Sequence, residues 1–280
     1  MTNHSSRRLL STYRWISHKL STTHLTEAEN AGIDGVEIFC SAGHFDYRDP
    51  ETVRDIAAWF RGHQMKLHSL HAPTSRDFSP GRESGSPVSV SDLERQRRLD
   101  AVDEIKRALE VAEKAPFEVM VLHFGGSRDS DDPRRWDVAF SSLENLALFA
   151  RQRGVTLALE NTTSEMATPG NLRHFIEETR LPGLKLCFDS GHAQIDGGAL
   201  PAMETMGALA VTTHLHDNHG EKDEHLLPYA GTIEWGKLLK MMPPELPLLL
   251  ELREQPNGSP TFDEIRAAFD ALEQARENSE

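Results

Sequence analysis

Nine side chains that can bind a metal lie at or shortly after the ends of short apolar runs. They are His71, His123, Glu160, Asp189, His192, His214, Asp223, His225 and Glu251. A carboxylate or imidazole at the end of a buried strand must be paired, hydrated or bound to a metal, because burying an isolated charge is costly. A mixed set of carboxylates and imidazoles suits zinc or manganese better than metals that prefer thiolates. The pattern therefore predicts a mononuclear or polynuclear divalent-metal site, and a metalloenzyme.

The elements that position these side chains form a repeating series. Runs typical of strands cover residues 10–16, 35–40, 66–71, 118–124, 155–160, 184–189, 210–216 and 248–252. Helical spacing of apolar residues lies between them, for example at 53–60, 99–112, 143–150 and 172–176. Eight strand–helix repeats predict an α/β fold, a (β/α)8 TIM barrel, as a single domain over residues 1–280. The carboxyl ends of its strands would bring the nine side chains together at one mouth.

The connections between these elements carry further signals. Asp92 and the Asp132-Pro133 pair are expected to start helices. The segment 74–91 is rich in Ser, Pro and Gly and follows the third strand, so it would lie on the mouth side. We expect this long loop to cover the substrate, with a passive insertion as the alternative. The charged tail at 273–280 is expected to fray.

Composition narrows the class of function. The chain has 280 residues, with 30 Lys and Arg against 44 Asp and Glu, giving a formal charge of −14. This charge disfavours generic binding to nucleic acid or to an anionic membrane. No run approaches the roughly 18 apolar residues of a membrane span, and the first residues do not resemble a signal peptide, so we expect a soluble cytoplasmic protein. Cys40 and Cys187 are expected to be buried thiols rather than a disulfide.

Several motifs resemble one known family. They are LENT at 159–162, FDSGHA at 188–193, HLHDN at 214–218, DEH at 223–225 and LLLE at 248–251. Nearly the whole chain resembles the xylose isomerase-like TIM barrels, which include endonuclease IV and the sugar-phosphate isomerases and epimerases. The resemblance implies a shared metal site at Glu160, Asp189, His214 and Glu251. It maps five further ligands of the trinuclear zinc site of endonuclease IV to His71, His123, His192, Asp223 and His225.

Three other residues are predicted to contact the substrate. His214 and His216 lie on the same face of a strand, so spacing alone does not decide which is the ligand. The resemblance favours His214, which leaves His216 as a substrate or ligand-supporting group. Glu37 would point into the mouth from the second strand, with pairing to an Arg or Lys as the alternative. Asn161 could bind a ligand or form a turn.

The resemblance implies that Glu160 and Glu251 move a proton on a carbon next to a carbonyl. We therefore predict a metal-dependent isomerase or epimerase of a small sugar, sugar phosphate or polyol-derived compound, with one to three zinc or manganese ions. The alternative is a trinuclear zinc phosphodiesterase like endonuclease IV, which the complete set of nine ligands favours and the acidic charge opposes. A metal-bearing binding protein is a third possibility. The oligomeric state is left open.

Overall fold

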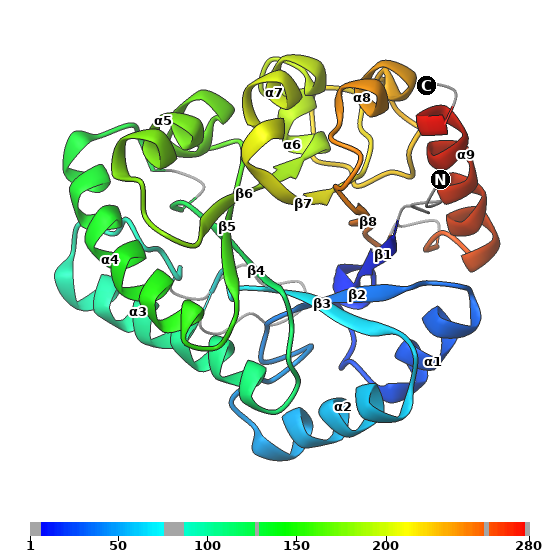
Figure 1. The fold of residues 1–280 in the computed structure, drawn as a ribbon, viewed down its shortest axis with the longest axis horizontal. Coiled ribbons are helices and arrows are strands. Elements are labelled where there is room, and N and C mark those ends of the chain that lie inside the picture. Colours follow the sequence, from blue (N-terminus) through cyan, green and yellow to red (C-terminus); the bar gives the residue numbers. More distant parts are fainter. Residues whose placement is uncertain (1–6, 76–86, 127–128, 255–257, 278–280) are drawn as a thin grey trace.

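Eight parallel strands form a ring surrounded by helices in the computed structural model, which describes residues 7–75, 87–126, 129–254 and 258–277 (Figure 1). The strands are hydrogen-bonded in the order β7-β6-β5-β4-β3-β2-β1-β8. Beyond β7, Leu215 N donates to Leu249 O at 2.8 Å and Glu251 N donates to Leu215 O at 3.2 Å, so the ring nearly closes. The predicted single-domain (β/α)8 barrel is confirmed.

The elements alternate along the chain. The strands are β1 (Arg8–Ser11), β2 (Gly35–Phe39), β3 (Lys66–His71), β4 (Val119–His123), β5 (Thr156–Glu160), β6 (Leu184–Asp189), β7 (Ala210–His214) and β8 (Leu248–Leu250). The α-helices are α1 (Thr22–Asn30), α2 (Pro50–Gly62), α3 (Arg95–Leu109), α4 (Pro133–Arg151), α5 (Pro169–Thr179), α6 (Ser190–Ile195), α7 (Ala199–Met206), α8 (Trp235–Met241) and α9 (Phe262–Glu277). Short 3-10 helices are η1 (Thr12–Trp15), η2 (Glu110–Glu113), η3 (Glu165–Ala167) and η4 (Gly207–Leu209).

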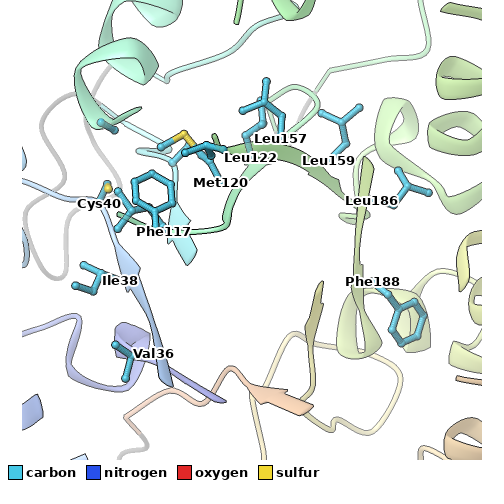
Figure 2. Packing of buried hydrophobic residues seen from close by; sticks show 14 of the residues in the cluster. Val36, Ile38, Cys40, Phe117, Met120, Leu122, Leu157, Leu159, Leu186 and Phe188 are labelled. Atoms are coloured by element: carbon cyan, nitrogen blue, oxygen red, sulfur yellow. The ribbon is translucent and has the colours of Figure 1, made fainter. Parts of the chain in front are cut away.

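Alternation along each strand separates two apolar layers. One set of side chains points from the strands toward the helices and belongs to the main core, including Val36, Ile38, Met120, Leu122, Leu157, Leu159, Leu186 and Phe188 (Figure 2). The residues that alternate with them fill the inside of the barrel, where Val119, Val121, Ala158 and Cys187 form a small buried cluster. Cys40 and Cys187 are buried free thiols, as expected. The polar strand ends lie above this inner cluster.

A register shift disturbs the alternation between β2 and β3. Val36 pairs with Leu67 and Glu37 pairs with Ser69, so His68 is an extra residue in β3. His68 Nε2 lies 3.2 Å from Thr212 Oγ1, and Ser69 Oγ donates to Glu37 at 2.9 Å. His68 therefore contacts β7 across the barrel while the next side chain, Ser69, contacts the neighbouring β2, and strict alternation does not predict two consecutive side chains that both contact other strands of the barrel.

Two predicted boundaries were wrong. The first strand ends at Ser11, whose side chain accepts a hydrogen bond from Tyr13 N and starts η1, so the strand predicted at 10–16 is shorter and earlier. Helix α3 starts at Arg95, because Asp92 accepts from Glu94 N in a turn before the helix rather than capping it. Asp132 does cap α4, as predicted, by accepting from Arg134 N.

The structure describes only part of the two segments that were expected to be irregular. Residues 273–277 form the last turn of α9 and follow the buried Leu272, and residues 278–280 lie outside the described part. The expected fraying of the tail at 273–280 stays a prediction. Of the loop 74–91, residues 76–86 also lie outside it. Its described ends pair with each other, because Val88 N donates to Thr74 O at 2.9 Å. Among the described helices, none is both long and apolar enough to cross a membrane.

Candidate metal centre

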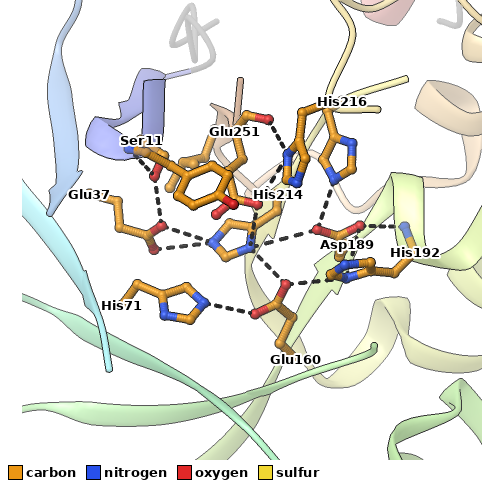
Figure 3. Close-up of polar contacts among 12 residues, drawn as sticks. Ser11, Glu37, His71, Glu160, Asp189, His192, His214, His216 and Glu251 are labelled. Atoms are coloured by element: carbon orange, nitrogen blue, oxygen red, sulfur yellow. Dashed lines mark hydrogen bonds and ion pairs between the residues drawn. The ribbon is translucent and has the colours of Figure 1, made fainter. Parts of the chain in front are cut away.

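A cavity of about 620 Å³ opens where the strands end. Of the nine predicted ligands, the cavity wall includes His71, His123, Glu160, His192, Asp223, His225 and Glu251. Asp189 and His214 are completely buried and contact these residues (Figure 3). The structure therefore gathers all nine predicted ligands at one end of the barrel.

Four of these residues form one compact group, which we call the four-ligand group: Glu160, Asp189, His214 and Glu251. They come from β5, β6, β7 and the residue after β8, and their ligand atoms lie within 4.8 Å of one another. His214 Nδ1 is 3.1 Å from Glu160 Oε1 and 3.8 Å from both Asp189 Oδ2 and Glu251 Oε2. One nitrogen thus faces three carboxylates (Figure 3).

The hydrogen bonds of His214 indicate that this group fits a cation. Its Nε2 lies 3.0 Å from Glu37 Oε1, and a carboxylate can only accept, so Nε2 carries the proton. In a neutral ring the Nδ1 lone pair then faces carboxylate oxygens, which are also acceptors. A divalent ion would satisfy all four ligands, with Glu37 as the outer carboxylate that fixes the ring of a metal-bound histidine.

His71 and His192 have a similar arrangement, with one ring nitrogen near a carbonyl and the other near a carboxylate. His71 Nδ1 lies 2.9 Å from the Ala72 carbonyl, while its Nε2 is 3.1 Å from Glu160 Oε2. His123 Nε2 approaches the same oxygen at 3.2 Å, and His71, His123 and Glu160 form a second compact group. His192 Nδ1 lies 3.0 Å from the carbonyl of Asn161. Histidines that bind metals characteristically donate their other ring N–H to a carbonyl or carboxylate.

The two predicted catalytic glutamates have opposite electrostatic environments. Burial favours the neutral form of Glu160, but the charges of His214 and His123 outweigh it and hold the pKa of Glu160 well below its ordinary value. Burial raises the pKa of Glu251 to about 7; the charge of His214 opposes this rise, and those of Glu160 and Asp189 add to it. Pairs of carboxylates whose pKa values are pushed apart are typical of acid–base sites.

The three residues predicted to contact substrate are all buried. Glu37 pairs with His214 and accepts hydrogen bonds from Ser11 and Ser69. The Asn161 side chain accepts from Asp189 N at 2.8 Å and donates to Asp189 O at 2.9 Å, which fixes the end of β6. His216 Nε2 lies 3.1 Å from Asp189 Oδ2. In the structure each of these residues therefore contacts a member of the four-ligand group.

Two aromatic residues of the cavity were not predicted. Tyr13 and Phe39 line one side with their ring centroids 5.3 Å apart, and Phe39 stacks on His71 at 4.5 Å. Phe39 is the last residue of β2 and Tyr13 lies in η1 just after β1, and at such positions sequence alone does not distinguish a cavity wall from core. Across the cavity, Gly125 and Gly126 follow β4, and Asp129 accepts from Gly126 N at 2.9 Å.

A parallel eight-stranded barrel with grouped histidines and carboxylates at its mouth defines an α/β barrel protein with a candidate divalent-metal centre. The chain belongs to the xylose isomerase-like TIM barrel family, whose model matches residues 25–275.

Individual proteins extend this comparison. An uncharacterized protein of Methanocaldococcus jannaschii is 27% identical over 236 residues, which cover 79% of this chain and 74% of that protein. A solved structure described as a D-tagatose 3-epimerase-like protein superposes with a TM-score of 0.77, 21% identity and 98% coverage of both chains. The IOLI protein with a bound zinc atom has a TM-score of 0.71 and 15% identity, with 97% of this chain and 96% of that chain covered. At these identities the solved structures show a shared fold.

Proposed function

We propose that this protein is a divalent-metal-dependent isomerase or epimerase of a small sugar or polyol-derived substrate. The observation that carries the proposal is the four-ligand group, in which Glu160 and Glu251 both face His214 Nδ1 beside the cavity. Membership of the family and the fold shared with an epimerase-like protein support it. A zinc or manganese ion held there would polarise a carbonyl oxygen and acidify the neighbouring C–H bond.

In this proposal different residues transfer protons, bind the metal and orient its ligands. Glu160 and Glu251 are the candidate bases that take a proton from the carbon next to the carbonyl and return it, on the same carbon in epimerisation or on a neighbouring one in isomerisation. Asp189 and His214 hold the centre, while Glu37 and Asn161 orient them. A cavity of about 620 Å³ is within the range of small-molecule sites. The rings of Tyr13 and Phe39 offer an apolar surface to the substrate.

A second candidate function is phosphodiester hydrolysis at a centre of up to three ions. It is favoured by a specific observation: Glu160 belongs both to the four-ligand group and to the group with His71 and His123, while Asp223 and His225 form a third group with His216. The charge of −14 opposes it, because a nuclease must hold phosphates.

The test is to strip the protein of metal and reload it with zinc or manganese. It is then incubated with a panel of keto sugars, followed by NMR, and with a duplex containing an abasic site. We expect epimers or isomers from at least one sugar, only with metal, and none from an Asp189→Ala variant. Metal-dependent cleavage of the duplex, with no sugar converted, would contradict the proposal and support the hydrolase.

A further inference from the structure

His216 occupies a position that does not suit contact with a substrate. Its exposed fraction is 0%. Its backbone is hydrogen-bonded to the side chain of Ser190, whose Oγ donates to His216 O at 2.7 Å and accepts from His216 N at 3.0 Å. The ring lies against Gly191, where an added Cβ would come within 2.0 Å of His216 Cε1. Glycine at 191 is therefore required for this ring to lie where it does.

The ring of His216 has one nitrogen without a hydrogen bond. Nε2 lies 3.1 Å from Asp189 Oδ2 and therefore carries a proton, since the carboxylate can only accept (Figure 3). Nδ1 is buried and has no hydrogen-bond partner. It faces Asp223 Oδ1 at 3.8 Å, which is too long for a hydrogen bond. A cation between this buried nitrogen and the Asp223 carboxylate would satisfy both atoms.

His225 presents a second such nitrogen to the same carboxylate. Its Nδ1 lies 3.0 Å from the carbonyl of Glu251, and its Nε2 is 2.9 Å from Asp223 Oδ2. The rings of His225 and His216 stack with centroids 4.1 Å apart. The backbone of His225 is held at φ 49°, a left-handed conformation that is unfavourable for a residue with a side chain and is common at functional sites.

We infer that His216, Asp223 and His225 bind a second divalent cation beside the four-ligand group, so that His216 is a metal ligand. The ligand atoms of these three residues lie within 4.8 Å of one another. Two donors on one zinc ion lie about 3.4 Å apart when the bonds are about 2.1 Å. The distances from Asp223 to His225 Nε2 and to His216 Nδ1, 2.9 and 3.8 Å, bracket that value. Two imidazoles and a carboxylate suit zinc.

This assignment differs from the ligand set that the sequence implied, in which His192 joins Asp223 and His225. His192 Nε2 is 3.4 Å from Asp223 Oδ2, but His192 is not part of the compact group. Asp189 connects the two positions, since it belongs to the four-ligand group and also fixes the His216 ring. The inference concerns metal binding alone and holds whichever reaction the protein catalyses.

The test is a zinc-edge anomalous difference map of crystals of the zinc-loaded protein, together with equilibrium dialysis. The variant is His216→Gln, because its amide can still donate to Asp189 but offers no ligand in place of Nδ1. The matched control is His192→Gln. We expect a peak bounded by His216, Asp223 and His225 in the wild type and in the control. In His216→Gln we expect this peak to disappear and one zinc ion per chain to be lost in dialysis, while the peak at the four-ligand group stays.

Two outcomes would overturn this inference alone: zinc at the four-ligand group with no peak beside His216 in the wild type, or a peak at Asp223 and His225 that persists in His216→Gln and disappears in His192→Gln. If His216→Gln does not fold, Gly191→Ala is the second variant, since its Cβ displaces the ring without deleting a ligand. It is expected to lose the same ion. A wild-type map with no zinc at either position would contradict both this inference and the metal-dependent function, so the two failures are distinguishable.

Discussion

Replacing Glu37 tests whether this residue orients the metal centre or contacts the substrate. Its two carboxylate oxygens lie 3.0 and 3.2 Å from His214 Nε2 and also accept hydrogen bonds from Ser11 and Ser69. Burial alone would raise the pKa of Glu37, but the charge of His214 outweighs it and lowers that pKa, so the group is ionised. An ionised Glu37 fixes the His214 proton on Nε2 and leaves Nδ1 for the metal.

The expected loss of zinc affinity depends on which interactions of residue 37 each variant retains. In Glu37→Gln the amide oxygen can still accept from His214, while the charge and one of the two oxygens that accept from Ser11 and Ser69 are lost, and we expect zinc affinity to fall about tenfold, or about 1.4 kcal/mol. In Glu37→Ala the acceptor is also lost, and we expect a fall on the order of 100-fold, or about 2.8 kcal/mol.

Zinc affinity is measured by competition with a chromophoric chelator on metal-stripped protein. The matched control is Glu104→Gln, which replaces the carboxylate of another buried glutamate. Glu104 accepts a hydrogen bond from Tyr47 at 2.5 Å and belongs to none of the candidate metal groups. We expect its zinc affinity to match the wild type. Unchanged affinity in both Glu37 variants, with a raised KM, would refute this reasoning and favour the substrate contact predicted from the sequence.

Three further predictions address catalysis, metal binding and pH. Glu251→Gln should lower kcat at least about 100-fold without changing the circular dichroism spectrum, and wild-type rates would remove Glu251 from catalysis. Asp189→Ala should bind less metal than the wild type, as measured by elemental analysis, and an unchanged number of metal ions per chain would show that the centre lies elsewhere. Burial lowers the pKa of His44 from 6.5 to about 4, so its contribution to stability is complete above pH 6.5 and falls by about 3 kcal/mol as the pH drops to 4. Urea unfolding of His44→Gln should therefore show a weaker loss of stability over this range than the wild type, and equal losses would contradict the assignment.

Much of the site could be predicted because a polar residue directly after an apolar run marks the end of a buried strand. Acidic or imidazole residues directly after apolar runs, as at Glu160, Asp189 and Glu251, can lie only at the mouth of a parallel barrel. The structure brings these residues together with His214, which the family pattern favoured over His216.

The depth and partners of each side chain could not be predicted in the same way. The sequence predicted that Glu37 and His216 contact the substrate, but whether such side chains face the cavity or lie beneath it depends on neighbours from other strands, such as Ser69 and Gly191. The register shift at His68 also depends on pairing between β2 and β3 rather than on either sequence alone. The first strand was placed too late because Ser11 starts a 3-10 helix inside an apolar run.

The most direct test of the proposed function is solvent deuterium exchange. The metal-loaded protein is incubated in deuterium oxide with a keto sugar that it converts, and the recovered sugar is analysed by NMR and mass spectrometry. If Glu160 and Glu251 move a proton next to a carbonyl, deuterium should appear on that carbon, only with metal present, and should be absent in Glu251→Gln. Conversion without any deuterium at that carbon, or equal incorporation by the metal-free protein, would contradict this account.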